Sequence, residues 1–395
     1  MKYAICVGDG MADFPVPDLD GLTPLEYAKT PGMDSIAAMG CVGRVQTVPD
    51  GLPPGSDVAN MSLMGYDAGK YYQGRAPIEA ASMGVSLKVN ETAFRCNFVT
   101  LQNGTMADYS AGHIETGVAR KLLEQVQEKL GNKRMRFYPG VSYRHLLVIA
   151  DVPEGKLDCT PPHDISGKHW NQHVPRGAGA EELLSIMDRA RAILSEAAAN
   201  KALVGKGKLP ATDIWLWGQG RAMKFPSMME RYGITGSVIS AVDLVQGLGV
   251  LAGLTVRKVA GATGYLGTNY AGKVEAALSA LREQDFVFIH VEAPDETSHE
   301  GSLHKKIQAI EEFDGNIVVE ILKMKNEFKD LRILVLPDHA TPVSLKTHHA
   351  MPVPFAVCGP GVKNGDAAVY SEKTAAGSPV ISAMALFETF INGVF

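Results

Sequence analysis

Paired cysteines, long apolar runs and an excess of positive charge are all missing from this sequence of 395 residues. Its five cysteines are scattered, and no two of them form a C-x-x-C pair. The sequence therefore argues against a disulfide framework or a thiolate zinc site and favours a reducing compartment. No apolar run reaches the roughly 18–20 residues of a membrane-spanning helix. The apolar run at residues 3–7 is too short for a signal peptide, so we expect a cytoplasmic protein without a membrane partner.

The balance of charges also limits the partners of the protein. Lys and Arg total 38 and Asp and Glu total 43, which gives a formal net charge of −5. Binding along a nucleic acid backbone calls for a positive surface, so no nucleic acid partner is expected. The sequence has no G-x-x-x-x-G-K-[ST] phosphate loop. Apolar residues make up 46% and charged residues 21%, which is typical of a soluble globular enzyme. The sequence does not indicate the oligomeric state.

Apolar strands alternate with helices in the first and last parts of the chain. Strands are expected at residues 3–7, 42–48, 286–291, 332–336 and 353–358, and helices at residues 25–38, 307–324 and 380–390. This alternation predicts an α/β fold whose mostly parallel sheet has helices on both faces. The middle of the chain is richer in charge, so residues 73–226 are expected to form an inserted α+β cap domain. Residues 1–72 and 227–395 would form one discontinuous catalytic domain, since 395 residues are many for a single core.

Four short polar motifs lie beside predicted strands. They are Gly8-Asp9-Gly10, Asp295-x-x-x-His299, Pro337-Asp338-His339 and His348-His349. Ligands of open α/β sheets bind beyond the carboxyl ends of the strands, so these positions suit a binding site. The spacing of Asp295 and His299 places both side chains on one face of a helix, as metal ligands require. Each motif alone is equally typical of a turn, a surface or a core.

Taken together, three carboxylates and three histidines beside one sheet suit a dinuclear metal site. Carboxylate and imidazole ligands favour Mn²⁺, Zn²⁺ or Mg²⁺ over metals that prefer thiolates. Two such ions about 3.5–4 Å apart can hold the entering and the leaving oxygen of a phosphoryl group. The sequence therefore predicts phosphoryl transfer with two divalent ions.

Ser56 is the candidate nucleophile for this chemistry. It follows the turn-rich residues 49–55 and begins a predicted helix, where it suits the N-cap position. Free N–H groups and the helix dipole at such a position stabilise an anion. A bound metal would lower the pKa of the hydroxyl and make an alkoxide accessible near neutral pH. Ser62 would lie inside or at the end of the same helix and is the weaker candidate.

These residues resemble those of a known family, the cofactor-independent phosphoglycerate mutases of the alkaline phosphatase superfamily. Gly55-Ser56-Asp57-Val58 matches the nucleophile motif of the family, and Gly74-Arg75-Ala76-Pro77 and Pro162-His163-Asp164-Ile165 resemble its archaeal-type branch. The resemblance implies that one metal is held by Asp9, Ser56, Asp338 and His339, and the other by Asp295, His299 and His348. His349 falls outside that pattern.

The resemblance also implies an alkaline-phosphatase-like fold and an activity. In the family, a glycolytic isomerase moves the phosphate of 3-phosphoglycerate to the serine and then to another hydroxyl, which gives 2-phosphoglycerate. The implied cofactors are two divalent ions, Mn²⁺ in the first place, with Mg²⁺ or Zn²⁺ as alternatives. Because the small phosphorylated substrate also carries a carboxylate, the cap is expected to offer cationic donors. The candidates are His113, His163, Asp164, Arg176 and Arg221, with Lys273 at the domain junction.

Three other functions stay open at this point. Some bacterial relatives of the archaeal-type mutases resemble homoserine kinases, with the same metal core and an amino-acid hydroxyl as acceptor. A phosphomonoesterase would keep Ser56 and the metals but release phosphate to water, although a closing cap domain disfavours hydrolysis. A metal-binding structural or regulatory protein without turnover is the interpretation from another class, and Ser56→Ala would separate it from an enzyme.

Overall fold

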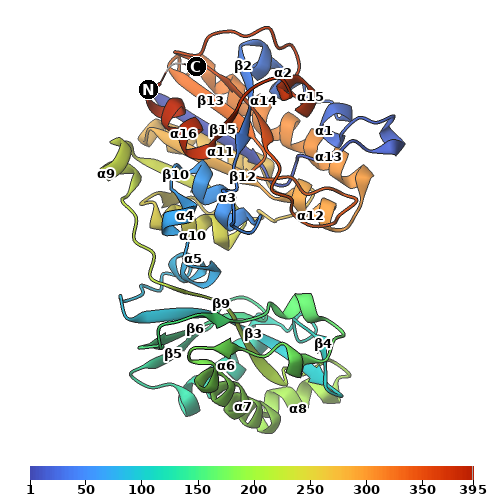
Figure 1. The fold of residues 1–395 in the computed structure, drawn as a ribbon, viewed down its shortest axis with the longest axis vertical. Coiled ribbons are helices and arrows are strands. Elements are labelled where there is room, and N and C mark those ends of the chain that lie inside the picture. The colour runs from blue at the N-terminus through green and yellow to red at the C-terminus, as the bar shows by residue number, and fades with distance from the viewer. Residues whose placement is uncertain (394) are drawn as a thin grey trace. The chain divides into compact units, whose positions relative to one another are not determined.

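Two stretches that are far apart in the sequence fold together into one unit (Figure 1). The computed structural model describes residues 1–393 and residue 395. Unit 1 comprises Met1–Tyr72 and Lys224–Phe395, and unit 2 is the segment between them, Gln73–Met223. The chain thus returns to unit 1 slightly before residue 227, where the catalytic domain was expected to resume.

Unit 1 is built on one large sheet that is mostly parallel. Its strands lie in the order β11 (Thr255–Val256), β10 (Gly236–Ile239), β12 (Phe286–Val291), β1 (Lys2–Gly8), β13 (Leu331–Leu336), β14 (Val353–Cys358), β2 (Gly40–Gln46) and β15 (Val380–Ser382). The central strand β1 pairs in parallel with both β12 and β13. Only β14 runs against its neighbours, β13 and β2. The predicted α/β class with a mostly parallel sheet is therefore confirmed.

Helices cover both faces of this sheet. Alternate side chains of β1 point to opposite faces, so Ala4 and Cys6 pack in one core while Tyr3 meets Phe390 on the other face. The first face carries α2 (Pro31–Ala38), α11 (Tyr270–Glu283), α13 (Leu303–Phe313) and α14 (Val319–Lys323). The second face carries α3 (Ser56–Leu63), α10 (Asp243–Leu251) and α16 (Ala383–Asn392). The remaining helices of the unit are α1 (Pro24–Tyr27), α4 (Ala68–Tyr71), α9 (Met228–Tyr232), α12 (Ala293–His299) and α15 (Glu372–Ala375).

All three predicted helices differ in extent from those of the structure. The helix expected at residues 307–324 already begins at Leu303 and continues from α13 through a π-helical turn (Asp314–Val318) into α14. The helix expected at residues 25–38 is two helices, α1 and α2, because Pro31 cannot continue a helix but is well suited to begin one. The helix expected at residues 380–390 starts later: Val380–Ser382 joins the sheet as β15, and the Ser382 hydroxyl caps α16 by accepting from the backbone N–H of Ala385.

Unit 2 combines an antiparallel sheet with helices. Its sheet contains β3 (Glu91–Gln102), β4 (Thr105–Asp108), β5 (Met135–Tyr138), β6 (Arg144–Ala150) and β9 (Asp213–Arg221), and a separate short pair is formed by β7 (Leu157–Asp158) and β8 (Arg176–Gly177). Its helices are α5 (Arg75–Ser82), α6 (Thr116–Leu130), α7 (Ala180–Glu196) and α8 (Ala198–Gly205). Apolar side chains of β3, β9, α6 and α7 form a core of its own. None of the helices in the described part of the chain is long and apolar enough to cross a membrane.

Candidate metal centre and active site

The candidate ligands gather at the carboxyl edge of the sheet in unit 1. Asp9 follows β1, the pair Asp338 and His339 follows β13, and α12, which holds Asp295 and His299, begins just after β12. These three strands are neighbours in the sheet, so their carboxyl ends meet. His348 reaches the same place from the loop that leads into β14. All the residues predicted as metal ligands therefore lie together, in two overlapping clusters.

The first cluster contains Asp295, His299 and His348. The Nε2 atom of His299 lies 3.1 Å from Oδ2 of Asp295 and 3.0 Å from Nε2 of His348. The Nε2 atom of His348 lies 3.6 Å from Oδ1 of Asp295. One ligand atom from each of these residues lies within 4.8 Å of the others, as a shared cation requires.

The second cluster surrounds Asp9. Its Oδ1 lies 3.4 Å from Nε2 of His339, and its Oδ2 lies 3.0 Å from Nε2 of His290. Oδ2 of Asp338 lies 3.6 Å from Nε2 of His339, and the hydroxyl of Ser56 lies 3.1 Å from the same nitrogen. Gly10 makes this close packing possible, since a Cβ on it would lie 2.5 Å from Oδ1 of Asp295.

The orientation of the histidines in the first cluster favours a cation. Nδ1 of His299 faces the carbonyl oxygen of Lys346 at 3.0 Å, and Nδ1 of His348 faces that of Pro54 at 2.8 Å. A carbonyl only accepts, so both rings carry a proton on Nδ1 and turn Nε2 toward Asp295, where that nitrogen either binds a cation or, when protonated, donates to the carboxylate. Burial opposes charge, but the Asp295 hydrogen bond is the larger effect and raises the pKa of His299 to about 9. A proton therefore holds this cluster together where a divalent ion would bind it.

A hydrogen-bond chain orients His339 in the same way. The hydroxyl of Thr341 donates to Oδ1 of Asp295 and accepts from Nδ1 of His339 at 3.1 Å. The lone pair of Nε2 of His339 therefore points toward Asp9 and Ser56. Burial tends to raise the pKa of Asp295, yet hydrogen bonds from His299 and His348 outweigh it and hold that pKa well below its usual range.

Buried carboxylates in the second cluster also fit a cation. Burial, together with Asp338, Asp295 and Glu292, raises the pKa of Asp9 well above its ordinary value. Oδ1 of Asp9 and Oδ1 of Asn60 are buried acceptors without a hydrogen bond among the described residues. Acceptors that lack a donor in a buried, negatively charged place suit a divalent metal ion. The residues of both clusters therefore fit divalent cations with mixed carboxylate and imidazole ligands.

Ser56 opens the helix that faces the second cluster. The N-cap of α3 is Gly55, and Ser56 is its first residue, so the expected N-cap role of Ser56 was wrong. Its hydroxyl is therefore not engaged with the helix and is turned to His339. Behind it, the amide of Asn60 donates to the Ser56 carbonyl at 2.9 Å and to Asp338 at 2.7 Å. Asp57 accepts a hydrogen bond of 2.5 Å from the hydroxyl of Tyr72.

Three functional positions of unit 1 escaped the sequence reasoning. His290 is the fifth residue of β12, and a buried strand histidine gives no sign of its partners. Asn60 lies four residues after Ser56 and shares its helix face, which is a usable signal. The role of Thr341 depends on how the loop after β13 packs against Asp295, so no sequence pattern indicates it.

Lys273 lies in the interior of unit 1, on α11. Its Nζ donates to the carbonyl of His290 at 2.9 Å, and burial lowers its pKa to about 8. Burial also raises the pKa of the nearby Glu292 to about 8, with further contributions from Glu296 and Asp295. The described structure thus places Lys273 behind the second cluster.

The candidates in unit 2 separate into two groups. The rings of His113 and His163 both lie near that of Tyr109, at 6.4 and 6.2 Å between centroids, and Asp164 is 3.5 Å from His163. The other two are bonded elsewhere. Arg221 pairs with the exposed Glu154, and Arg176 donates to a backbone carbonyl, that of Gln172.

Two arginines that were not singled out lie beside His163. Burial lowers the pKa of His163, Asp164 opposes that shift, and the charges of Arg95 and Arg75 add to it. Arg95 stacks on the ring of Trp217 at 4.1 Å, and that ring is 5.3 Å from His163. The motif that contains Arg75 was noted only for its resemblance to the archaeal-type branch, although arginine is a preferred donor to phosphate and carboxylate.

Comparisons with known proteins identify the family of this chain. The family model described as 2,3-bisphosphoglycerate-independent phosphoglycerate mutase matches residues 37–200. A protein of that name from Methanosarcina barkeri is 52% identical over 95% of each chain. A probable one from Geobacter sulfurreducens is 49% identical over 99% of this chain and 100% of its own. A solved cofactor-independent phosphoglycerate mutase from Thermoplasma acidophilum is 27% identical, with a TM-score of 0.67 over 99% of both chains. The chain therefore belongs to the 2,3-bisphosphoglycerate-independent phosphoglycerate mutases.

Proposed function

We propose that this enzyme interconverts 3-phosphoglycerate and 2-phosphoglycerate through a phosphoserine at Ser56. The observation that supports this most is the position of the Ser56 hydroxyl, 3.1 Å from Nε2 of His339 in the second ligand cluster. The names of the relatives supply the reaction class. Unit 1 is the catalytic domain in this proposal, and unit 2 is the cap that binds the substrate.

The proposed ligands are those that the resemblance assigns. One ion is held by Asp9, Ser56, Asp338 and His339, and the other by Asp295, His299 and His348; His290 is an additional candidate ligand beside Asp9. The ions are Mn²⁺ in the first place, with Mg²⁺ or Zn²⁺ as alternatives. When bound, they supply positive charge that stabilises the phosphoryl group and favours the ionised form of the serine.

The chemical steps follow from the position of Ser56. Its Oγ forms a bond to the phosphorus of 3-phosphoglycerate while the bond to the O3 oxygen breaks. The serine proton is lost, and O3 takes up a proton to become a hydroxyl. The oxygen of the neighbouring hydroxyl then forms a bond to the phosphorus while the bond between phosphorus and Oγ breaks, and the proton of that hydroxyl is replaced by one taken up at Oγ, which restores Ser56. Backbone N–H groups at the start of α3 face the phosphate in both steps, and the helix dipole favours its negative charge.

The substrate is proposed to rest on the group around Tyr109 in unit 2. His113, His163 and Asp164 belong to this group, and Arg75 adds positive charge suited to a carboxylate or phosphate, whereas the nearby Arg95 is buried and already pairs with Glu79 at 3.0 Å. Arg176 and Arg221 lie in other hydrogen bonds and contribute less to binding in this proposal.

A paired assay tests the proposal. Chelated protein is reconstituted in parallel with Mn²⁺, Mg²⁺ and Zn²⁺ and given 3-phosphoglycerate, and enolase reports the 2-phosphoglycerate formed. We expect turnover that Ser56→Ala abolishes while calorimetry still detects metal binding, and Ser62→Ala serves as the matched control that stays active. Release of inorganic phosphate without 2-phosphoglycerate would indicate a phosphomonoesterase. Phosphorylation of homoserine by ATP in a second arm, without mutase turnover, would replace the proposed reaction by a kinase reaction.

A further inference from the structure

Asn60 is a fully buried asparagine inside α3, the helix that begins at Ser56. Asparagine is a poor residue for the interior of a helix, because its side chain competes for the backbone hydrogen bonds. Burying its amide also costs free energy unless hydrogen bonds satisfy the polar atoms. The position of Asn60 therefore needs a reason, and the partners of its amide supply one.

The amide nitrogen of Asn60 bonds to two different parts of the site. Nδ2 donates to the carbonyl of Ser56 at 2.9 Å and to Oδ2 of Asp338 at 2.7 Å. A carbonyl and an ionised carboxylate only accept, so these partners fix which end of the amide is the nitrogen. The first bond stays within α3, whereas the second crosses to the end of β13, 278 residues further along the chain. Asn60 thereby joins the first turn of the helix that carries Ser56 to a candidate metal ligand.

The bond from Asn60 completes a set of donors that hold the Asp338 carboxylate. Its Oδ1 accepts from the backbone N–H groups of Gly10 at 3.1 Å and of His339 at 2.9 Å. Its Oδ2, which accepts from Asn60, lies 3.6 Å from Nε2 of His339 in the second cluster. A carboxylate oxygen has two lone pairs, so this bond leaves one of them for a cation. Hydrogen bonds of this kind orient metal ligands, and losing one costs about 10- to 100-fold in metal affinity or activity.

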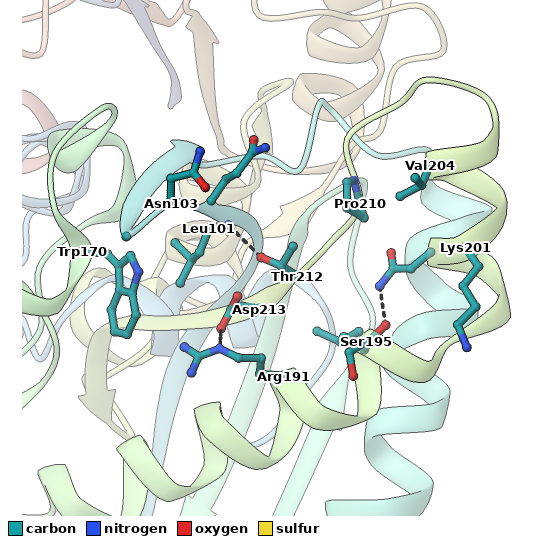
Figure 2. Close-up of a pocket in the computed structure, with 14 residues that line it drawn as sticks. Leu101, Asn103, Trp170, Arg191, Ser195, Lys201, Val204, Pro210, Thr212 and Asp213 are labelled. Atoms are coloured by element: carbon teal, nitrogen blue, oxygen red, sulfur yellow. Dashed lines mark hydrogen bonds and ion pairs between the residues drawn. The ribbon is translucent and has the colours of Figure 1, made fainter.

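Asn200 of unit 2 shows what an asparagine with a purely structural role looks like. It is almost completely buried, and it lines the cavity of about 580 Å³ shown in Figure 2. Its Nδ2 donates to the carbonyls of Leu194 and Ala211, at 2.8 Å each, and its Oδ1 accepts from the N–H of Ala211 at 3.0 Å. Both ends of this amide are satisfied by the backbone of its own unit.

Asn60 differs from Asn200 at both ends of its amide. Its Nδ2 bonds to the carboxylate of a candidate metal ligand, and its Oδ1 is buried without a hydrogen bond among the described residues. A buried acceptor without a donor lowers stability. The stability of α3 alone therefore does not account for an asparagine at this position.

We propose that Asn60 is a positioning residue for Asp338 and Ser56. Its amide holds Oδ2 of Asp338 in the second cluster and fastens the first turn of α3 to the loop after β13. The Ser56 hydroxyl is thereby kept beside Nε2 of His339, at 3.1 Å. The inference rests on the metal ligands and the nucleophile of the proposed function, and it adds a residue that acts through them without touching the substrate.

Calorimetric titration of the chelated protein with Mn²⁺ tests this role separately from turnover. Asn60→Leu keeps the branched shape of the side chain but removes the amide, and Asn60→Ala removes the branch as well. We expect the wild type to bind two ions and each variant to bind one of them about 10- to 100-fold more weakly. Binding of the other ion should change by less than about twofold, because the first cluster does not contact Asn60. His348→Ala disables the first cluster, and the binding step that remains in that background should be the weakened one.

Two other asparagines provide matched controls. Asn200→Ala removes a buried amide and should lower stability without affecting either binding step. Asn316→Ala removes an exposed amide that also donates to the carbonyl four residues before it, that of Glu312 at 2.9 Å, and should change neither. Unchanged Mn²⁺ binding in both Asn60 variants would overturn the proposal. Equal weakening of both steps would overturn it too, since that result indicates a general loss of structure.

Kinetics at saturating Mn²⁺ give a second measurement. We expect kcat of Asn60→Leu to fall about tenfold while KM for 3-phosphoglycerate changes by less than about twofold, because Asn60 acts on Ser56 and not on the substrate. A raised KM with unchanged kcat would contradict the positioning role. If the wild type forms no 2-phosphoglycerate, the proposed function fails, whereas the calorimetry still decides whether Asn60 orients a metal ligand.

Discussion

Replacing Lys306 by methionine should destabilise unit 1 far more than most single substitutions. Nζ of Lys306 bonds to Oδ2 of Asp13 at 2.8 Å and to the carbonyls of Thr341 and Ala12 at 2.9 and 3.2 Å. Both charged side chains are almost completely buried, at 0% and 1% exposure. The lysine thereby joins the loop after β1, which carries Asp9, to the loop after β13, which carries two further candidate ligands.

The magnitude follows from what the methionine leaves behind. Met fills most of the volume of the lysine stem, so little packing is lost. The Asp13 carboxylate, however, remains buried without a cation, and breaking a buried pair in this way costs about 3–5 kcal/mol. The backbone N–H groups of Phe14 and Val343 still donate to Asp13, which places the expected loss of unfolding free energy nearer about 3 kcal/mol.

Urea unfolding followed by far-ultraviolet circular dichroism measures this loss, with a chelator present so that metal binding does not contribute. Lys323→Met is the matched control in the same unit, because Lys323 pairs with Glu320 in solvent and should change stability by less than about 0.5 kcal/mol. Asp13→Asn combined with Lys306→Met should recover at least about 1 kcal/mol, since the uncompensated charge is removed. A change below about 1 kcal/mol for Lys306→Met alone would refute the reasoning.

Three further predictions concern single contacts. Burial lowers the pKa of His145 to about 3, so the unfolded chain binds the proton first and unit 2 loses stability as the pH falls from about 6.5 toward 3. All three tryptophans lie in unit 2, so unfolding of this unit can be followed by tryptophan fluorescence. The free energy of unfolding should fall by about 1.4 kcal/mol per pH unit in this range, and His145→Gln should lack this dependence. Tyr72→Phe should lower kcat about tenfold with little change in KM, because the Tyr72 hydroxyl holds Asp57 beside the nucleophile; unchanged kinetics would contradict this. Gly74→Ala should lower the free energy of unfolding, measured by thermal unfolding, by more than about 2 kcal/mol, because φ of Gly74 is +115° and a Cβ there would lie 2.1 Å from the backbone oxygen of Gln219.

The strands and their polar ends could be predicted because parallel strands impose a simple rule. Strands buried on both faces are continuous apolar runs, and those at Phe286–Val291 and Val353–Cys358 were predicted with the bounds that the structure has. The carboxyl ends of neighbouring parallel strands meet at one edge, so Asp9, Asp295 and Asp338 were expected to lie close together. The rule needs no knowledge of distant contacts, since each of these three carboxylates comes shortly after a strand.

The local sequence does not reveal the direction in which a strand runs or the residues at which a helix begins and ends. The apolar run of β14 reads the same whether it is parallel or antiparallel to β13. Val380–Ser382 is equally compatible with a helix by its pattern, and it becomes a strand because β2 offers it a free edge. These outcomes are decided by neighbours that local sequence does not reveal.

Two charged residues that the sequence reasoning missed, Lys306 and Arg95, have neighbours far away in the sequence. Lys306 lies on an amphipathic helix where a lysine normally reaches solvent, and its carboxylate partner is 293 residues away. Arg95 lies on a strand, and its closeness to His163 depends on how β3 and β9 pair. A charged side chain is expensive to bury unless its counter-charge is brought to it, so a buried charge indicates where the fold has joined distant segments. In unit 1 that junction is between the two loops that carry the candidate ligands, which is why the Lys306 variant also tests how the metal centre is held.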